Sequence, residues 1–253
     1  MCIVAPVLLR LTHYEGLIVN ERASYETSSA AATEVDPWSN TAAPWSVMPR
    51  VPMVETVVAR LRERPDAAVL IFEDGATLSR GELLSRAEKF AAYLIEHVPE
   101  RSPVALALEN RAEFFIAWLA MLGTGHPMIS LNPAVRETDA THMLRDSGAV
   151  LAVAGPAAAN VLNAVKDRCA QLRQILVVGN EEPDGLSAFQ AQSTQFDLLS
   201  APPQLDAISY ISYTSGTTGT PKGCVHLHGE VVRYADIAGR LYRLEQTDRI
   251  LNP

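Results

Sequence analysis

Short apolar runs alternate with helical patterns from residue 104 to residue 178, and this alternation constrains the fold more than any other feature. The run at 104–108 is almost continuously apolar, which is typical of a strand covered on both faces. Further strands are expected at 128–131, 150–154 and 175–178, with helices between them at 112–122, 138–145 and 157–169. The pattern favours an α/β fold with a mostly parallel sheet flanked by helices, whose ligand loops lie at the carboxyl ends of the strands.

The flanking segments extend this pattern on both sides. A capping-box spacing of Ser79 and Glu82 predicts the start of a helix that continues to Leu94. Gly123 is the expected C-cap of the helix at 112–122. The other expected elements are a helix at 51–62, strands at 68–72 and 208–213, and a helix at 230–244.

The domain organisation follows from composition along the chain. Residues 1–50 include a long stretch rich in Ser, Thr, Ala and Pro without a sustained period, which predicts a poorly ordered leader. The folded part is therefore expected at 51–253, as a partial N-terminal domain. Within it, residues 181–206 look like an excursion that links the early units to the strand at 208–213.

Charge and cysteine content exclude several classes of partner. The net charge of −8 argues against nucleic acid or an anionic membrane, because both favour clustered Lys and Arg. The apolar segment 112–122 is about half of the roughly 20 residues that span a bilayer. The three cysteines suggest neither a disulfide framework nor a zinc site, so the expected location is the cytoplasm. Cys224 is expected to be a small buried apolar residue.

Residues 214–223 carry the chemistry. This run combines Ser and Thr hydroxyls, three glycines and one lysine behind an apolar strand. Glycines let the backbone approach an anion closely, while amides, hydroxyls and an ammonium supply donors and charge for phosphate oxygens. The spacing does not match a P-loop, because Pro221 precedes Lys222 and Gly223 follows it. An ordinary Ser/Thr/Gly turn is the alternative interpretation.

The run from Tyr213 to Gly223 resembles, almost residue for residue, the phosphate-binding signature of the adenylate-forming superfamily, which includes acyl- and aryl-CoA ligases and peptide-synthetase adenylation domains. Collinear similarities upstream, at 77–83, 119–133 and 142–149, extend the resemblance over about residues 55–235. Taken alone, each upstream motif is explained by fold-building residues. Asn132, where peptide-synthetase domains usually have Asp, favours the CoA ligases.

The resemblance implies a reaction and a set of site residues. It implies activation of a small-molecule carboxylic acid by ATP, with Mg²⁺, as an acyl-adenylate, followed by thioester formation with coenzyme A. The hydroxyl donors to the β- and γ-phosphates would be Thr214, Ser215, Thr217 and Thr218. Gly216 and Gly219 would allow close backbone approach, and Lys222 would neutralise charge. His228, often present in the family, has a structural explanation near the start of a helix, and His226 has less support for any role.

The family elements that follow the phosphate loop do not occur in the printed sequence. They are the segment that contacts adenine and magnesium, the ribose-binding aspartate, and the small C-terminal domain with its catalytic lysine. No catalytic residue and no metal ligand is therefore assigned here. The chain is interpreted as the N-terminal part of a ligase, with a truncated, non-catalytic nucleotide-binding module or a gene remnant as the alternative.

Overall fold

Two sheets form the core of the molecule, seen here in a computed structural model that describes residues 2–4, 51–179, 196–214, 220–245 and 248–252. The larger sheet has the strand order β7-β6-β4-β5-β8-β9, and the smaller has the order β10-β1-β2-β3. The strands are β1 (Cys2–Val4), β2 (Ala68–Phe72), β3 (Thr77–Ser79), β4 (Val104–Ala107), β5 (Met128–Ser130), β6 (Leu151–Ala154), β7 (Gln174–Val177), β8 (Ile208–Thr214), β9 (Lys222–Leu227) and β10 (Ile250–Asn252). The helices are α1 (Met53–Glu63), α2 (Arg80–His97), α3 (Ala112–Thr124), α4 (Glu137–Ser147), α5 (Pro156–Val165), the short 3₁₀ helix η3 (Lys166–Arg168) and α7 (His228–Leu241).

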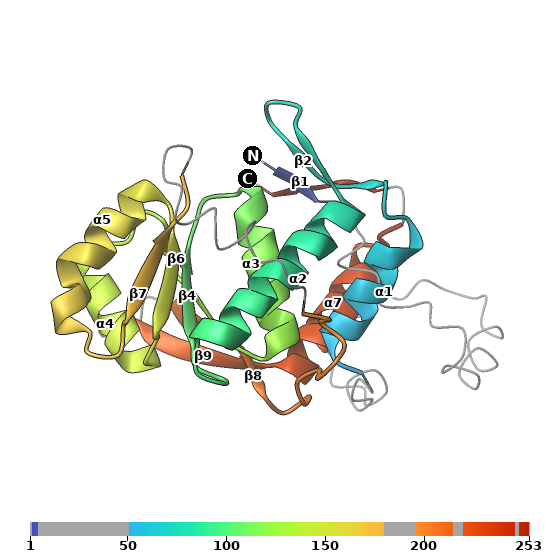
Figure 1. The fold of residues 1–253 in the computed structure, drawn as a ribbon. Helices are drawn as coiled ribbons and strands as arrows, with labels where there is room; N and C mark the ends of the chain where they lie inside the picture. The colour runs from blue at the N-terminus through green and yellow to red at the C-terminus, as the bar shows by residue number, and fades with distance from the viewer. Residues whose placement is uncertain (1, 5–50, 180–195, 215–219, 246–247, 253) are drawn as a thin grey trace, which may run out of the picture.

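Helices cover the larger sheet on both faces, as the apolar run of β4 predicted. Val104 and Leu106 of β4 belong to a core cluster shared with α1, α2 and α3, while Ala105 and Ala107 face a second cluster shared with α4 and α5. Figure 1 shows α4 and α5 on one side of the strands and α2 and α3 on the other. A strand buried on both faces has no polar position, which explains the continuous apolar sequence.

The sheet is parallel throughout except at one edge. Strand β4 pairs in parallel with β5 and β6, β5 pairs with β8, and β6 pairs with β7. Strand β9 then returns antiparallel to β8. The predicted α/β class with a mostly parallel sheet is confirmed. The smaller sheet is antiparallel at each of its three pairings, and it contains the strand expected at 68–72.

The predicted start of α2 is confirmed, whereas the predicted end of α3 is wrong. The Ser79 side chain accepts a hydrogen bond from the Glu82 backbone, and the Glu82 carboxylate accepts one from the Ser79 backbone. At the end of α3, the left-handed cap is Gly125 with φ of 71°, not Gly123. Gly123 lies inside the helix, and glycine is required there because a Cβ would come within 2.6 Å of the Leu198 side chain.

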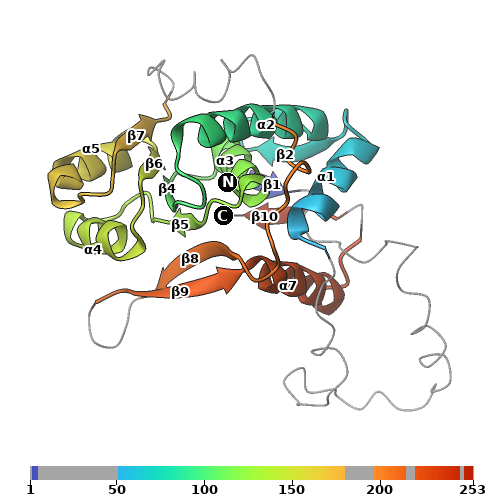
Figure 2. The same cartoon turned by 60° about the horizontal axis from the view of Figure 1, so that its bottom comes forward.

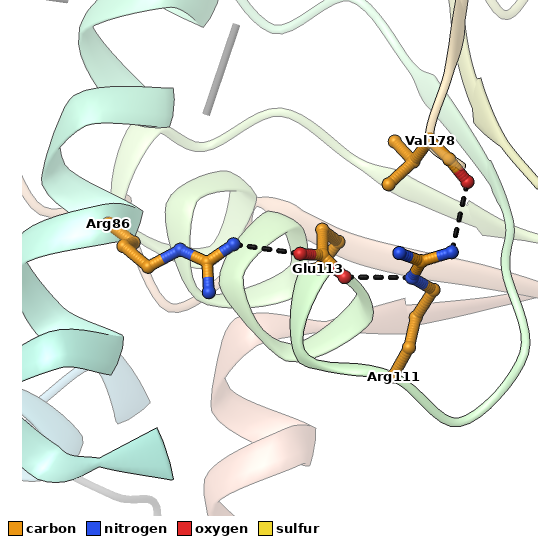
Figure 3. A network of polar contacts seen from close by, with 4 residues as sticks. All are labelled: Arg86, Arg111, Glu113 and Val178. Carbon is orange, nitrogen blue, oxygen red and sulfur yellow. Dashed lines mark hydrogen bonds and ion pairs between the residues drawn. The ribbon is translucent and has the colours of Figure 1, made fainter. Parts of the chain in front are cut away.

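A buried carboxylate joins α2, α3 and the end of β7. Glu113 is only 7% exposed and accepts hydrogen bonds from Arg86 at 2.8 Å and from Arg111 Nε at 2.7 Å. Arg111 also donates to the Val178 carbonyl at 3.0 Å, so the carboxylate lies between two guanidinium groups (Figure 3). Burial raises the pKa of Glu113, but the bonds from the two arginines more than offset it and hold the pKa below its ordinary value.

Only a small part of the predicted leader is described. Residues Cys2–Val4 form β1 between β2 and β10, which places the two ends of the chain close together (Figure 2). Residues 5–50 lie outside the described residues, as does most of the predicted excursion at 181–206. Within the described part of the chain, no helix is both long enough and apolar enough to cross a membrane.

Candidate functional site

The predicted phosphate loop connects the two strands of a hairpin at one edge of the larger sheet. Thr214 is the last residue of β8 and Lys222 is the first residue of β9, and the two are directly paired in the antiparallel register. Both side chains are exposed. Because β8 runs parallel to β5, Thr214 lies at the edge where the carboxyl ends of the parallel strands meet.

The structure therefore brings together a hydroxyl and an ammonium from the two ends of the predicted loop. The remaining predicted residues, Ser215, Gly216, Thr217, Thr218 and Gly219, lie outside the described residues. Their assignments stay predictions. Strand β9 itself was not predicted, since the sequence between the loop and α7 shows no clear alternation. The loop is followed by a returning strand and not directly by a helix.

Helix α4 contacts both ends of this loop. The His142 ring nitrogen Nε2 lies 2.7 Å from the carbonyl oxygen of Pro221, the residue before Lys222. The Tyr213 hydroxyl, one residue before Thr214, donates to the Asp146 carboxylate at 2.7 Å. Burial first, and then the hydrogen bond and negative charge of Asp146, raise the pKa of Tyr213 far above its ordinary value, so that the hydroxyl remains a donor.

A second polar cluster lies further along the hairpin. The His226 ring stacks on Tyr210 with centroids 4.2 Å apart and meets the Tyr234 ring edge-on at 6.1 Å. His226 Nε2 lies 3.2 Å from the Ser212 hydroxyl. These contacts join β8, β9 and α7, and they give His226 a packing role between the sheet and the helix.

His228 begins α7 and is 1% exposed. Neither of its ring nitrogens has a hydrogen-bond partner within the part of the chain that the structure describes. Burial lowers the pKa of His228 to about 4, so the neutral imidazole is the stable form near pH 7. The structure places His228 at the start of α7, as expected, but its ring makes no capping hydrogen bond among the described residues.

Sequence reasoning missed the residues that contact the loop from α4. His142 and Asp146 were assigned only to a scaffold motif, and no local pattern connects them with residues about 70 to 80 positions later. The expectation for Cys224 was also wrong, because this side chain lies exposed on β9, paired with Ser212. Its place on an edge strand explains the exposure.

The described residues offer no ready metal site. Across the described ranges, no group of three or more His, Cys, Asp or Glu side chains is arranged to hold a metal ion. The two described ends of the loop present the hydroxyl of Thr214 and the ammonium of Lys222, groups that suit an anion.

Comparisons with known proteins agree on one family. A family model described as "AMP-binding enzyme" matches residues 57–253. Phosphinothricin tripeptide synthetase PhsB from Streptomyces viridochromogenes is 34% identical over 204 residues, which cover 78% of this chain and 16% of that protein. Tyrocidine synthase 2 from Brevibacillus parabrevis is 34% identical over 177 residues, which cover 69% of this chain and 4% of that protein. The chain thus spans a small part of these relatives.

Solved structures share the fold. The anthranilate CoA ligase AuaEII in complex with anthranoyl-AMP has a TM-score of 0.64 at 19% identity, covering 71% of this chain and 34% of that one. A long-chain-fatty-acid-CoA ligase, FadD1, from Archaeoglobus fulgidus has a TM-score of 0.69 at 17% identity, covering 80% of this chain and 41% of that one.

Proposed function

Because the chain belongs to the AMP-binding enzyme family, we propose that it forms the phosphate-binding part of an enzyme that activates a carboxylic acid with ATP. The observation that carries the proposal is the direct pairing of Thr214 with Lys222 at the carboxyl edge of the sheet. This pairing places a hydroxyl donor and a cation on neighbouring strands, at the two ends of a Ser/Thr/Gly loop.

In the proposed reaction, a carboxylate oxygen of the substrate attacks the α-phosphorus of ATP. The bond from that phosphorus to the bridging oxygen breaks, and pyrophosphate leaves with the electron pair. Negative charge grows on the departing oxygens, so donors fixed near them lower the barrier.

Thr214 would donate a hydrogen bond to the departing oxygens, and Lys222 would neutralise their charge. Ser215, Thr217 and Thr218 would add hydroxyls, and Gly216 and Gly219 would permit close approach. Mg²⁺ would be bound with the nucleotide, and none of the residues named above is proposed as its ligand.

The acceptor of the acyl group is a separate question. A thioester with coenzyme A is proposed from the resemblance of the sequence to CoA ligases, and the structural neighbours that carry that name share the fold. The names of the curated relatives, which are peptide synthetases and synthases, favour an acceptor that leads to a peptide. We keep coenzyme A as the proposed acceptor for the chain and the peptide route as its alternative. Location in the cytoplasm stays a prediction.

The test is ATP–pyrophosphate exchange by the full chain, measured with a panel of carboxylic acids. Lys222→Ala should lower the exchange rate by about 100- to 1,000-fold, as removal of one charge-stabilising donor does in other enzymes. Lys89→Ala is the charge-matched control and should keep the wild-type rate, because Lys89 lies on α2, which packs on the opposite face of the larger sheet from α4. An unchanged rate for Lys222→Ala would refute the role of the lysine.

The alternative function is a nucleotide-binding module without catalysis. Equilibrium binding of pyrophosphate, measured beside ATP–pyrophosphate exchange, distinguishes this module from the ligase. Binding that depends on Lys222 without any exchange would support the module, and exchange would support the ligase.

A further inference from the structure

We propose that His142 and Asp146 are positioning residues, which together form a clamp from α4 onto both ends of the phosphate loop. The inference rests on the proposed function, because the groups that it positions are Thr214 and Lys222. It adds two residues on a helix that lies outside the hairpin. The clamp is defined by two contacts, His142 with Pro221 and Asp146 with Tyr213.

The first contact fixes the end of the loop that carries the lysine. A carbonyl oxygen can only accept a hydrogen bond, so the 2.7 Å contact with Pro221 requires a proton on His142 Nε2. Both the neutral tautomer with that proton and the imidazolium can donate it. The bonded carbonyl belongs to the residue directly before Lys222, and its position sets where β9 begins.

The second contact fixes the end of the loop that carries the threonine. Tyr213 donates to the Asp146 carboxylate at 2.7 Å and lies 3.3 Å from the Met143 carbonyl of the same helix. A hydrogen bond to a charged acceptor is stronger than one between neutral groups. It holds the backbone one residue before Thr214 against α4.

The two contacts act as one unit. His142 and Asp146 are four positions apart, so they lie on the same face of α4. The His142 and Tyr213 rings meet edge-on, with centroids 6.3 Å apart and planes at 82°. Across the hairpin, Gly223 is paired with Tyr213, and a Cβ on Gly223 would come within 3.3 Å of the tyrosine ring. Glycine at this position therefore leaves room for the ring to reach α4.

A fixed loop base matters for the chemistry. Pairing in register keeps Thr214 and Lys222 opposite each other, but β9 has a single strand neighbour among the described residues. The clamp gives this edge a second support from outside the sheet. Pre-organised donors lower a barrier without a reorganisation cost at the moment of reaction.

The experiment compares variants of His142 in the full chain. His142→Phe keeps a ring but removes the donor, and His142→Gln restores an N–H donor that can reach a carbonyl. We measure amide hydrogen exchange in β8 and β9 and the equilibrium binding of inorganic pyrophosphate. His142→Phe should raise exchange at Lys222–Leu227 and the pyrophosphate Kd by about 3- to 10-fold, the size expected for one hydrogen bond.

Controls separate positioning from general stability. His142→Gln should restore exchange and binding to about the wild-type values, and Tyr213→Phe should raise exchange near Thr214. Arg145→Gln, an exposed change on the same helix, should alter neither quantity. Unchanged exchange in His142→Phe would overturn the clamp. The clamp would also be overturned if amide exchange in His142→Phe rose equally in β4 and β6. The same holds if His142→Gln showed the same exchange and binding as His142→Phe.

The outcome also distinguishes the clamp from the proposed function. If the wild-type chain does not bind pyrophosphate, the phosphate-binding function fails. The exchange comparison still decides whether α4 holds the hairpin, because that readout needs no ligand.

Discussion

At the scale of single residues, His228 makes the stability of the chain depend on pH. Its folded pKa of about 4 lies below the unfolded value of about 6.5, so the unfolded chain binds more protons between these values. The contribution of the neutral ring is complete above the unfolded pKa and is lost as pH falls through the window toward the folded pKa. From about pH 7 to about pH 4, the loss should be on the order of 3 kcal/mol.

The measurement is the free energy of unfolding in urea at several pH values. His228→Leu removes the titrating group, so its stability should fall less steeply with acid than that of the wild type. The control is His97→Gln, which removes a histidine on α2 whose side chain is 42% exposed and should keep the acid dependence of the wild type. Equal acid dependence of wild type and His228→Leu would contradict the assignment.

At the scale of elements, the capping box defines where α2 begins. Hydrogen bonds to the Glu82 carboxylate lower the pKa of Glu82. The larger contribution comes from the Ser79 backbone N–H and the smaller from the Ser79 side chain. Ser79→Ala should cost about 1 kcal/mol of stability, because it leaves a helix N–H without its partner. Ser79→Asn, which preserves a side-chain acceptor, should cost much less. Chemical denaturation of the three proteins checks this order, and equal losses would show that the cap is not the cause.

At the scale of the whole molecule, the hairpin edge exposes apolar side chains. Val225 of β9 is 51% exposed, while Leu241 and Tyr242, which are 59% and 71% exposed, lie outside the hairpin at the end of α7. Strand β9 is also the last strand of its sheet in the described part of the chain. An apolar edge strand can pair with another chain, so we expect the protein to self-associate as concentration rises.

Light scattering over a concentration series tests this expectation. Val225→Lys should reduce self-association, because a charge on an edge strand opposes pairing. Ile95→Lys changes a similarly exposed side chain on α2, at 49%, and should have little effect. A monomeric wild type, or equal effects of the two variants, would count against the edge as the contact.

Local patterns explain which elements were predictable. The capping box needs only Ser79 and Glu82, three positions apart, and the apolar run of β4 reflects burial on both faces. Strand β9 was missed because most of its residues are exposed, so burial imposes no alternation on its sequence. The end of α3 was misplaced because the glycine at position 123 makes room for the side chain of Leu198, 75 positions away, and does not end the helix.

The sequence by itself determined the α/β class, the family and the Ser/Thr/Gly/Lys run, because each depends on residues that are near one another in the chain. Only the tertiary structure decided that Lys222 begins a strand opposite Thr214 and that α4 contacts both ends of the loop. The physical reason is that a strand pairing, or a contact such as that of His142 with Pro221, depends on how distant segments pack. Local sequence propensity does not determine that packing.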